Sequence, residues 1–522
     1  MSKDGNQASL DTTTLAALPE SWSWARVVEV ADVQGGIQKQ PKRRPINNAY
    51  PYLRVANVHR NRLDLAEIHK IELFGDELRR LRLETGDLLI VEGNGSLTEI
   101  GRSALWNGVI ENCVHQNHII RVRFLAGVPQ FLNYFWNSTE GNQRVMDAAA
   151  STSGLYTLSV TKVSRLPVPI APVAEQKRIA SKVDELFSDL DAGVTALQRA
   201  KAKLKRYRAA VLKAAVEGKL TAEWRAKHPP KETAAQLLER ILKDRRRHWE
   251  VEQLAAFERA GKKPPANWKE KYKEPAGPND TNLPALPEGW CWASMQQVGK
   301  VQLGRQRAPQ HHVGPHMRPY LRVANVFEDR IDISDVMEMN FTPDEYEVYR
   351  LHHGDILLNE GQSMELVGRP AIYRDEVPGA CFTNTLVRFQ SSCDLDNDYA
   401  LAVFLTYLKN GRFQKIATIT VNIAHLGAGR FAELEFPLPP LTEQKQVVAE
   451  VNRHLSVVHA IESQITADLK RSTRLRQSIL KRAFDGKLVP QDPKDEPANV
   501  LLERIKAEKT DTKGKAKPRK TK

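Results

Sequence analysis

The 522-residue chain has few of the features that mark secreted, membrane or metal-binding proteins. Its four cysteines include no Cys-x-x-Cys pair, which argues against a disulfide framework or a zinc site. No run approaches 18 consecutive apolar residues, so we expect no membrane span. The N-terminal sequence MSKDGNQASLDTTT lacks the basic and apolar pattern of a secretory signal. We therefore expect a cytoplasmic protein. The cysteines are Cys113, Cys291, Cys381 and Cys393.

Motifs that carry catalysis are missing as well. The sequence has no G-x-x-x-x-G-K-[ST] phosphate loop, no H-E-x-x-H and no G-x-S-x-G. It also lacks the N/D-P-P-Y type of tetrapeptide expected of amino-group DNA methyltransferases. We expect no catalytic residue and no metal site. The histidines that cluster, without spacing that supplies a fourth ligand, are His311, His312, His316, His352 and His353.

Two pairs of carboxylates recur after similar sequences, Asp87 with Glu92 and Asp355 with Glu360. A catalytic pair is one interpretation of them. A Gly-Asp dipeptide before an apolar run is more typical of a turn that enters a buried strand. We prefer the turn.

The net charge of +14 is concentrated in three segments. Residues 505–522 hold 8 basic and 2 acidic residues, residues 198–213 hold 7 basic residues, and residues 470–482 hold 6, the last two without any acidic residue. A basic protein favours a polyanionic partner. Because the rest of the chain is slightly acidic, its surface is not uniformly positive.

The strongest signal is an internal repeat. YLRVANV at 52–58 recurs at 320–326, and LPESW at 18–22 recurs as LPEGW at 286–290, both at an offset of 268 residues. The same offset relates GDLLIVEG at 86–93 to GDILLNEG, and EQK at 175–177 to its second occurrence. The chain is one unit used twice.

Each copy has a globular part, a proline-marked exit (LPVPIAP or FPLPPL) and a long helical segment that ends at a Gly-Lys-Leu sequence. Copy one ends its globular part near residue 170 and copy two near residue 440. The division we predict is an N-terminal segment (1–17), a first globular domain (18–172), a first long helix (173–218), a spacer with a charged helix and a Pro-rich linker (219–285), a second globular domain (286–440), a second long helix (441–486), and a C-terminal helix with a disordered basic tail (487–522).

Both long segments carry an apolar seam at spacings of three and four residues. In the first, Val183, Leu186, Leu190 and Leu197 follow it, which predicts a helix of roughly 60 Å. Such a helix needs a partner, and the simplest arrangement pairs the two copies antiparallel. The alternative is that each helix packs separately on its own globular domain.

Three loop regions differ between the copies while the strand frames match. They are 35–45 against 304–319, 93–102 against 361–369, and 114–124 against 381–390. They are rich in Arg, Asn, Gln, Ser and Lys, which read base edges or phosphates. Ordinary divergence of surface loops is the alternative. The DNA-binding residues that we predict from chemistry and loop position are Lys39, Arg43, Arg44, Asn94, Ser96, Arg102, Gln116, Asn117, Arg305, Arg307, Gln362, Ser363, Arg369 and Asn384.

The repeat and its motifs resemble the specificity subunits of type I restriction-modification systems. The resemblance rests on LPEGW at the start of a globular part, PLPPLTEQK before a long helix, and SILKRAFDGKLVPQDPKDEPANVLLERI at its end. The first copy has similar elements in EQKRIASKVDELFSDLD and AAVLKAAVEGKLTAEWR. The similarity covers about 18–505.

The resemblance implies an α/β (α+β) fold, with two tandem target-recognition domains separated by two long helices in an antiparallel coiled coil. The helices at 173–218 and 441–486 would be the central and distal conserved regions. Each domain would read one half of a bipartite, asymmetric site in double-stranded DNA, and the helices would fix the gap between the halves. Two methyltransferase (modification) subunits and the restriction subunits would be the partners. S-adenosylmethionine, ATP and Mg would bind to those partners, and this chain would bind no cofactor and be no enzyme.

The two globular parts differ in charge. Residues 18–170 hold 18 basic and 15 acidic residues, whereas residues 286–440 hold 14 and 19. The acidic second domain would attract DNA only weakly without regard to sequence, so more of the affinity for DNA would have to come from the assembled complex. Two other functions stay open at this point. One is a stand-alone coiled-coil protein that binds DNA or acts as a scaffold, and the other is a two-domain enzyme.

Overall fold

A computed structural model describes residues 15–152, 154–279 and 281–514, which form two compact units. Unit 1 contains the chain up to Gln198 together with the residues from Thr466 onward. Unit 2 is the continuous segment Arg199–Ile465. Each unit therefore holds one globular part and a portion of each long helix. Most of the predicted N-terminal segment and the end of the predicted basic tail lie outside the described residues.

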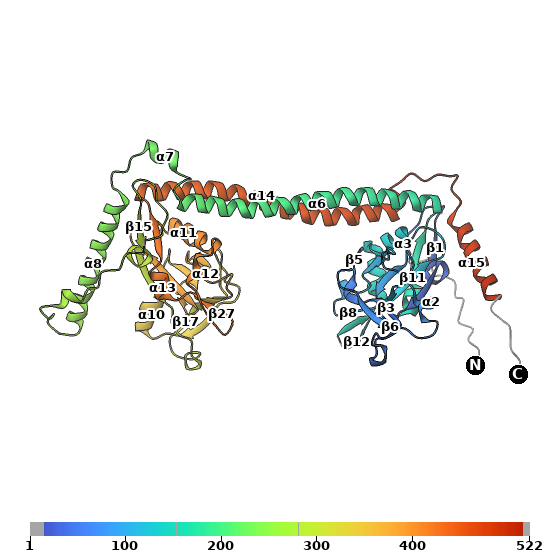
Figure 1. Ribbon diagram of the computed structural model, residues 1–522, viewed down its shortest axis with the longest axis horizontal. Coiled ribbons are helices and arrows are strands. Elements are labelled where there is room, and N and C mark those ends of the chain that lie inside the picture. Colours follow the sequence, from blue (N-terminus) through green and yellow to red (C-terminus); the bar gives the residue numbers. More distant parts are fainter. Residues whose placement is uncertain (1–14, 153, 280, 515–522) are drawn as a thin grey trace. The chain divides into compact units, whose positions relative to one another are not determined.

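The globular part of unit 1 is built from short strands and short helices (Figure 1). Its strands are β1 (Ser23–Arg26), β2 (Ala31–Gly35), β3 (Ala49–Leu53), β4 (Val58–His59), β5 (Arg62–Leu63), β6 (His69–Glu72), β7 (Leu88–Val91), β8 (Gly93–Asn94), β9 (Ser103–Leu105), β10 (Val114–His115), β11 (Ile119–Phe124), β12 (Ala150–Thr152), β13 (Leu155–Thr157) and β14 (Pro167–Ile170). Its helices are α1 (Val27–Val30), α2 (Glu77–Leu81), α3 (Pro129–Trp136), α4 (Thr139–Ala148) and α5 (Val160–Arg165).

The globular part of unit 2 repeats this order. Its strands are β15 (Cys291–Ser294), β16 (Gly299–Leu303), β17 (Met317–Leu321), β18 (Val326–Phe327), β19 (Arg330–Ile331), β20 (Met337–Asn340), β21 (Ile356–Asn359), β22 (Gly361–Gln362), β23 (Pro370–Ile372), β24 (Cys381–Phe382), β25 (Leu386–Ser391), β26 (Thr418–Thr420), β27 (Ile423–His425) and β28 (Glu435–Leu438). Its helices are α9 (Met295–Val298), α10 (Pro343–Tyr349), α11 (Asn397–Lys409), α12 (Arg412–Ile416) and α13 (Ala428–Ala432).

A four-stranded antiparallel sheet lies at the centre of each globular part. Its strand order is β2-β11-β7-β9 in unit 1 and β16-β25-β21-β23 in unit 2. The middle strands β7 and β21 are the apolar runs LLIV and ILLN, and all their residues are buried. Asp87 and Asp355 precede these strands, and their side chains pair with Arg123 and Arg388 inside the unit. The turn interpretation of Asp87 and Asp355 therefore fits.

A glycine follows the first strand of the central sheet in each unit, Gly36 after β2 and Gly304 after β16, and in both places a side chain would clash with the neighbouring backbone. A Cβ atom on Gly36 would lie 2.2 Å from the carbonyl oxygen of His115, and one on Gly304 would lie 2.2 Å from that of Thr383. Both backbones pass too close for any side chain. The first variable loop consequently starts in contact with the third.

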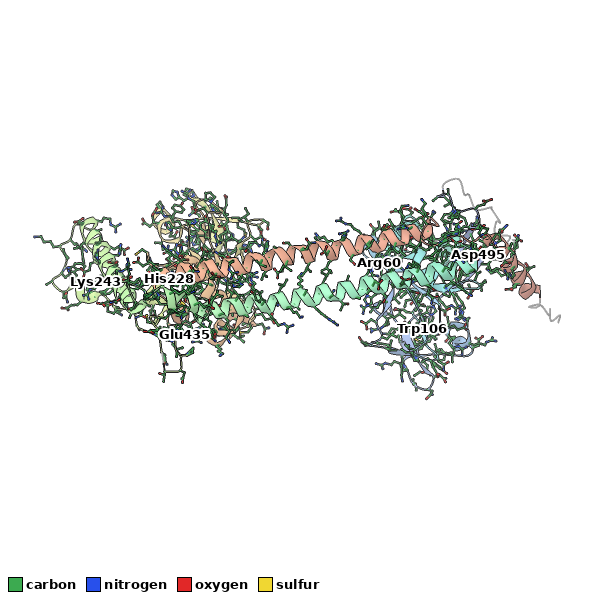
Figure 2. All side chains as sticks on the ribbon, turned by 90° about the horizontal axis from the view of Figure 1, so that it is seen from above. Arg60, Trp106, His228, Lys243, Glu435 and Asp495 are labelled. Atoms are coloured by element: carbon green, nitrogen blue, oxygen red, sulfur yellow. The ribbon has the colours of Figure 1, made fainter. Side chains whose placement is uncertain are left out.

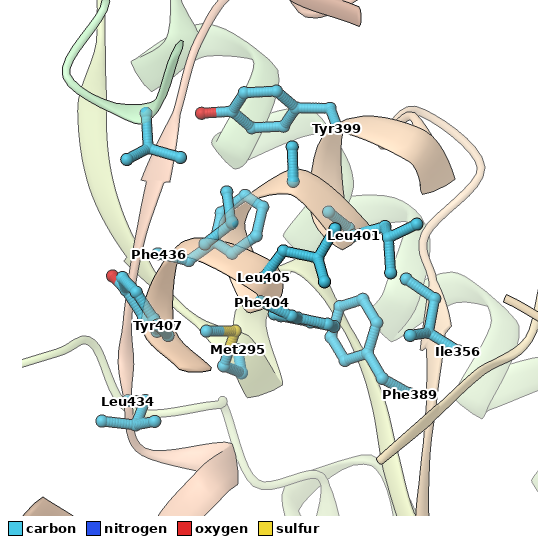
Figure 3. Packing of buried hydrophobic residues seen from close by; sticks show 14 of the residues in the cluster. Met295, Ile356, Phe389, Tyr399, Leu401, Phe404, Leu405, Tyr407, Leu434 and Phe436 are labelled. Atoms are coloured by element: carbon cyan, nitrogen blue, oxygen red, sulfur yellow. The ribbon is translucent and has the colours of Figure 1, made fainter. Parts of the chain in front are cut away.

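Aromatic and aliphatic side chains fill the core of each unit. In unit 2, Phe389 of the central sheet packs edge to face against Phe404 of α11, with ring centroids 5.1 Å apart (Figure 3). In unit 1, Phe131 of α3 packs in the same way against Trp22 and Phe484, at 5.7 and 5.2 Å. Phe484 belongs to the second long helix, so the helix end is part of this core.

The long helices are α6 (Val173–Val216) and α14 (Leu441–Phe484), and each unit contains a section where they contact each other. In unit 2 the Tyr207 hydroxyl lies 2.7 Å from Nδ1 of His454. In unit 1 Arg476 forms an ion pair with Asp191. The direction is antiparallel in both sections, which confirms the predicted pairing and the α/β (α+β) class. The ends of the long helices also pack into the globular cores. The alternative prediction, that each helix packs on a globular domain, therefore describes the helix ends.

The repeated sequence motifs join each globular part to its long helix. The indole of Trp22 in LPESW donates to the buried Glu175 of EQK (3.0 Å), and Trp290 donates to Glu443 (2.8 Å). The side chain of Gln176 accepts from the Val128 amide and donates to the Ala171 carbonyl. These buried bonds fix where the helix begins relative to the sheet.

Each long helix is followed by shorter ones that stay in the unit where it ends. Helices α7 (Ala222–Lys227) and α8 (Ala234–Arg259) follow α6 in unit 2, and α15 (Ala498–Gly514) follows α14 in unit 1. Asp495, labelled in Figure 2, lies just before α15, and Arg178 of α6 pairs with it at 2.7 Å. The segment after α8 contains a turn at Trp268–Lys271, whose Trp268 stacks on Trp249 of α8.

Candidate nucleic-acid interface

The variable loops of unit 1 emerge from one end of its central sheet. Because neighbouring strands are antiparallel, β2 and β7 end at the edge where β9 and β11 begin. In unit 2, β16 and β21 end where β23 and β25 begin. The topology therefore brings together, within each unit, the three regions that the sequence comparison singled out.

The third predicted loop is mostly strand, which corrects the sequence interpretation. Residues 114–124 form β10 and β11, with only the turn 116–118 between them, and 381–390 form β24 and most of β25. The sequence IIRVRF alternates weakly but is buried on both faces over its first four residues. The part of this region that lies at the loop end of the sheet is the turn.

Loop 35–45 of unit 1 contains a 3-10 turn at Pro41–Arg43. Lys39 and Arg44 are exposed there. Arg43 is not, because its guanidinium forms two 2.9 Å bonds to the Glu77 carboxylate, which raises the pKa of the arginine. Arg43 thus holds the loop, a role that the prediction of DNA contact missed.

The corresponding loop of unit 2 contains Arg305 and Arg307. Arg305 is 6% exposed, with Nε 2.9 Å from Glu345 and Nη1 2.6 Å from the Asn340 carbonyl. Its guanidinium is therefore held inside the unit, and the predicted contact of Arg305 with DNA stays a prediction. Arg307 is exposed and lies 5.6 Å from the centre of the Tyr320 ring.

The second loop region carries the predicted polar pairs. Asn94 ends β8, and its side-chain oxygen accepts from the amide of Ser96 (2.9 Å). Ser96 is exposed at the tip. Arg102 is largely withdrawn, since its guanidinium donates to the Val55 carbonyl (3.1 Å).

In unit 2, Gln362 ends β22 and Ser363 is exposed beside it. Arg369 is half-buried, and its guanidinium lies 4.6 Å from the centre of the Phe327 ring. Burial lowers the pKa of Arg369. Thus Arg102 and Arg369 occupy the same place in the two units and both pack inward.

The turn that precedes β11 connects the loop regions. The amide of Asn117 donates to the Ile37 carbonyl (2.9 Å), and the amide of Gln116 donates to the Leu53 carbonyl (2.9 Å). In unit 2, the amide of Asn384 donates to the Arg305 carbonyl (2.9 Å). The side chains of Gln116, Asn117 and Asn384 remain partly exposed, and their contact with DNA stays a prediction.

Sequence reasoning missed two residues beside the first loop. Tyr52, in the repeated YLRVANV motif, is 2% exposed but its hydroxyl has no hydrogen-bond partner among the described residues. Lys70 of β6 is exposed on the neighbouring strand. Because Tyr52 lies in a motif that is identical in both copies, the sequence suggests a structural role for it, and no sequence pattern indicates that its hydroxyl is unpaired.

No group of three or more His, Cys, Asp or Glu side chains suited to a metal ion occurs in 15–152, 154–279 and 281–514. His311 instead lies by Arg305 of the first loop region, and the backbone amide of His316 donates to the side chain of Asn340 in β20. None of the helices in the described part of the chain is long and apolar enough to cross a membrane.

Known proteins that resemble the chain share one description. The family model "Type I restriction modification DNA specificity domain" matches residues 319–471. The type I restriction enzyme StySPI specificity subunit of Salmonella potsdam is 25% identical over 524 residues, which cover 96% of this chain and 98% of that protein. The EcoKI specificity subunit of Escherichia coli (strain K12) is 24% identical over 528 residues, with the same coverage.

Solved structures show the same fold. A chain from a structure titled for complex assembly and conformational transition of the type I R-M system has a TM-score of 0.63 at 16% identity, covering 91% of this chain and all of the other. The HsdS subunit from Thermoanaerobacter tengcongensis has a TM-score of 0.50 with the same identity and coverage. Together with the sequence relatives and the duplicated units, these findings show that the chain is similar, over nearly its whole length, to the specificity subunits of type I restriction-modification systems.

Proposed function

We propose that the chain selects a bipartite, asymmetric DNA sequence and directs methylation and restriction by partner subunits. The observation that carries this proposal is the convergence, in each unit, of two variable polar loops and the turn of the third variable region at one end of the central sheet. A constant scaffold with variable loops suits two modules that read different half-sites. In the major groove, Asn and Gln side chains pair with adenine and Arg pairs with guanine.

The chemistry would reside in the partners. We propose two methyltransferase subunits that bind S-adenosylmethionine, and restriction subunits that use ATP and Mg, acting in the cytoplasm. The chain itself would supply no catalytic group. The relationship to specificity subunits favours this function over a stand-alone DNA-binding or scaffold protein. Co-expression with a candidate methyltransferase tests the difference, because a stable mixed complex is expected here and not for the alternative.

An exchange of loops tests whether each unit recognises its own half-site independently of the other. Segments 35–45, 93–102 and 116–118 of unit 1 are replaced together by those of another family member, and methylated bases are mapped across the host genome. We expect one half of the methylated sequence to change and the other half to stay. A simultaneous change in both halves would refute separate reading. Exchange of the exposed Val251 and Leu254 on α8 is the matched control and should leave both halves unchanged.

The long helices would set the gap between half-sites. An insertion of one helical turn within 186–211, with the same insertion opposite it in α14, adds about 5.4 Å. DNA rises 3.4 Å per base pair, so the tolerated gap should grow by about one to two base pairs. The same methylation map measures it. An insertion in the Pro-rich segment 261–267 should leave the gap unchanged, and an unchanged gap in the helix variant would exclude this role.

A further inference from the structure

A pocket of about 580 Å³ lies between the first variable loop of unit 1 and strand β6. Pro41 and Ile71 contribute apolar walls, and the cationic side chains of Lys39, Arg44 and Lys70 line it. Among the described residues, these three cations have no carboxylate partner. Unpaired positive charge around a concave surface favours an anion.

Tyr52 adds a neutral hydroxyl donor to the residues that line the pocket. The Tyr52 side chain lines the pocket, and its hydroxyl oxygen is buried without a hydrogen-bond partner. Buried hydroxyls are almost always paired, so an orphan one calls for an explanation. Burial raises the pKa of Tyr52, and the hydroxyl therefore keeps its proton. A ligand oxygen at this point would satisfy it.

The loop is held in place before any ligand arrives. The Glu72 carboxylate accepts from the backbone amides of Ile46 (2.7 Å), Asn47 (3.2 Å) and Asn48 (2.7 Å), and these bonds lower its pKa. Arg43 fastens the other side of the loop through Glu77. A preformed site loses little conformational freedom on binding.

The equivalent strand pair of unit 2, β17 and β20, has different side chains at the positions that correspond to Tyr52 and Lys70. Tyr52 pairs with His69, and the equivalent Tyr320 pairs with Met337, whose sulfur lies 3.5 Å from the Tyr320 hydroxyl. The next position on the strand is Lys70 in unit 1 and the acidic Glu338 in unit 2. The feature is therefore specific to unit 1 and is not a requirement of the shared scaffold.

We propose that this pocket binds a backbone phosphate of the DNA, with the Tyr52 hydroxyl donating to a phosphate oxygen and Lys39, Arg44 and Lys70 neutralising its charge. This inference rests on the proposed function. It makes unit 1 the source of a sequence-independent, salt-dependent part of the affinity. Arg43 positions the loop and does not touch the phosphate.

The first test measures binding of the full chain to a mixed-sequence 30-base-pair duplex by fluorescence anisotropy at several salt concentrations. The slope of log affinity against log salt should fall by about 0.9 when a phosphate contact is lost. We expect this for the combined variant Lys39→Ala and Arg44→Ala. Lys42→Ala is the matched control, because Lys42 is exposed in the same loop but does not line the pocket. An equal change in the control would overturn the pocket as a site.

The second test uses Tyr52→Phe. The variant loses a donor to a charged acceptor, so affinity for the duplex should fall about tenfold, with the salt slope nearly unchanged. Thermal unfolding should not be weakened, because the hydroxyl has no partner in the free protein. Tyr320→Phe is the control and should bind DNA as the parent does. Unchanged affinity of Tyr52→Phe would overturn the proposed hydrogen bond.

The third test separates a DNA phosphate from free phosphate. Duplexes with one neutral methylphosphonate linkage at each position in turn should reveal one or two sensitive linkages in the parent chain. The sensitivity should vanish in Lys39→Ala with Arg44→Ala. If inorganic phosphate at constant ionic strength displaces the duplex and no linkage is sensitive, the pocket is a free-phosphate site. Failure of the parent chain to bind any duplex contradicts the proposed function, whereas parent binding with unaffected variants contradicts only this inference.

Discussion

Glu175 in unit 1 and Glu443 in unit 2 occupy the same place but have different partners. Glu443 accepts from Trp290, from the Thr221 hydroxyl (2.6 Å) and from Arg225 (2.8 Å). Within the part of the chain that the structure describes, Glu175 accepts from Trp22 alone, and its second oxygen is buried without a partner. The added partners of Glu443 come from the segment that follows α6. Duplication has kept the motif, while the segment that packs onto it has diverged.

A second pair of equivalent positions shows the same kind of divergence. His115 and Phe382 both end the short strand that pairs with the YLRVANV strand. Phe382 lies 4.9 Å below the Arg388 guanidinium. His115 is fully buried, and burial lowers its pKa to about 3. Unit 1 thus contains a titratable group where unit 2 contains a neutral ring.

The largest difference between the units should follow removal of the buried carboxylate. Glu443→Ala leaves the Arg225 guanidinium without its charge partner, which should cost about 3–5 kcal/mol of unfolding free energy. Glu175→Ala removes one indole bond, and about 1 kcal/mol is expected. Urea unfolding gives the energies, and hydrogen exchange in 441–455 and 173–187 shows which unit loosens. Equal losses would contradict the comparison.

Acid should destabilise unit 1 through His115. Because the folded pKa lies below the ordinary 6.5, the unfolded chain binds the proton more readily, and stability is lost as pH falls below about 6.5. The loss is about 1.4 kcal/mol per pH unit in this window. His115→Phe should remove it, as measured by urea unfolding at pH 7 and pH 5.

The reciprocal variant is the control for that experiment. Phe382→His should give unit 2 an acid-sensitive transition that the parent lacks. If His115→Phe kept the parent's full dependence on pH, another group would be responsible.

Glu175→Gln should have a smaller effect of the opposite sign. Burial raises the pKa of Glu175 above that of the unfolded chain, so its contribution to stability is present below about pH 4.5 and is lost as pH rises through the raised value. The amide keeps an acceptor for Trp22 without the buried charge. We expect about 1 kcal/mol of added stability at pH 7 and a flatter pH profile by thermal unfolding. Glu443→Gln should destabilise instead.

The smallest expected effect concerns a helix cap. Ser159 is the N-cap residue of α5 in unit 1, and its side chain accepts from the Lys162 amide, whereas Gly427 is the N-cap residue of the equivalent α13. Ser159→Ala should cost about 1 kcal/mol, and Ser159→Gly, which imitates unit 2, only a few tenths. Urea unfolding can separate the two. Similar losses for both variants would show that the hydroxyl does not matter here.

The sequence predicts the features that depend on local patterns. The 268-residue offset gives the repeat, and the spacing of Val183, Leu186 and Leu190 gives the long helix. Side-chain roles that depend on distant partners could not be predicted. Arg43 is fastened by Glu77, 34 residues away, and Arg305 by Glu345, 40 residues away. As a result, two of the predicted DNA-binding arginines hold loops together.

Unit 1 is assembled from the two ends of the chain, and this affects how it folds during synthesis. Its core includes Phe484 and the α15 residues Leu501 and Ile505, and the Ala498 amide donates to the Ser21 carbonyl. The part of the chain that leaves the ribosome first therefore completes its core last. At 5–20 residues per second, roughly 15–60 s separate the synthesis of Gln198 from that of Ile505. Unit 2, one continuous stretch, can finish folding in that interval, while the apolar surface of unit 1 waits for the C-terminal segment.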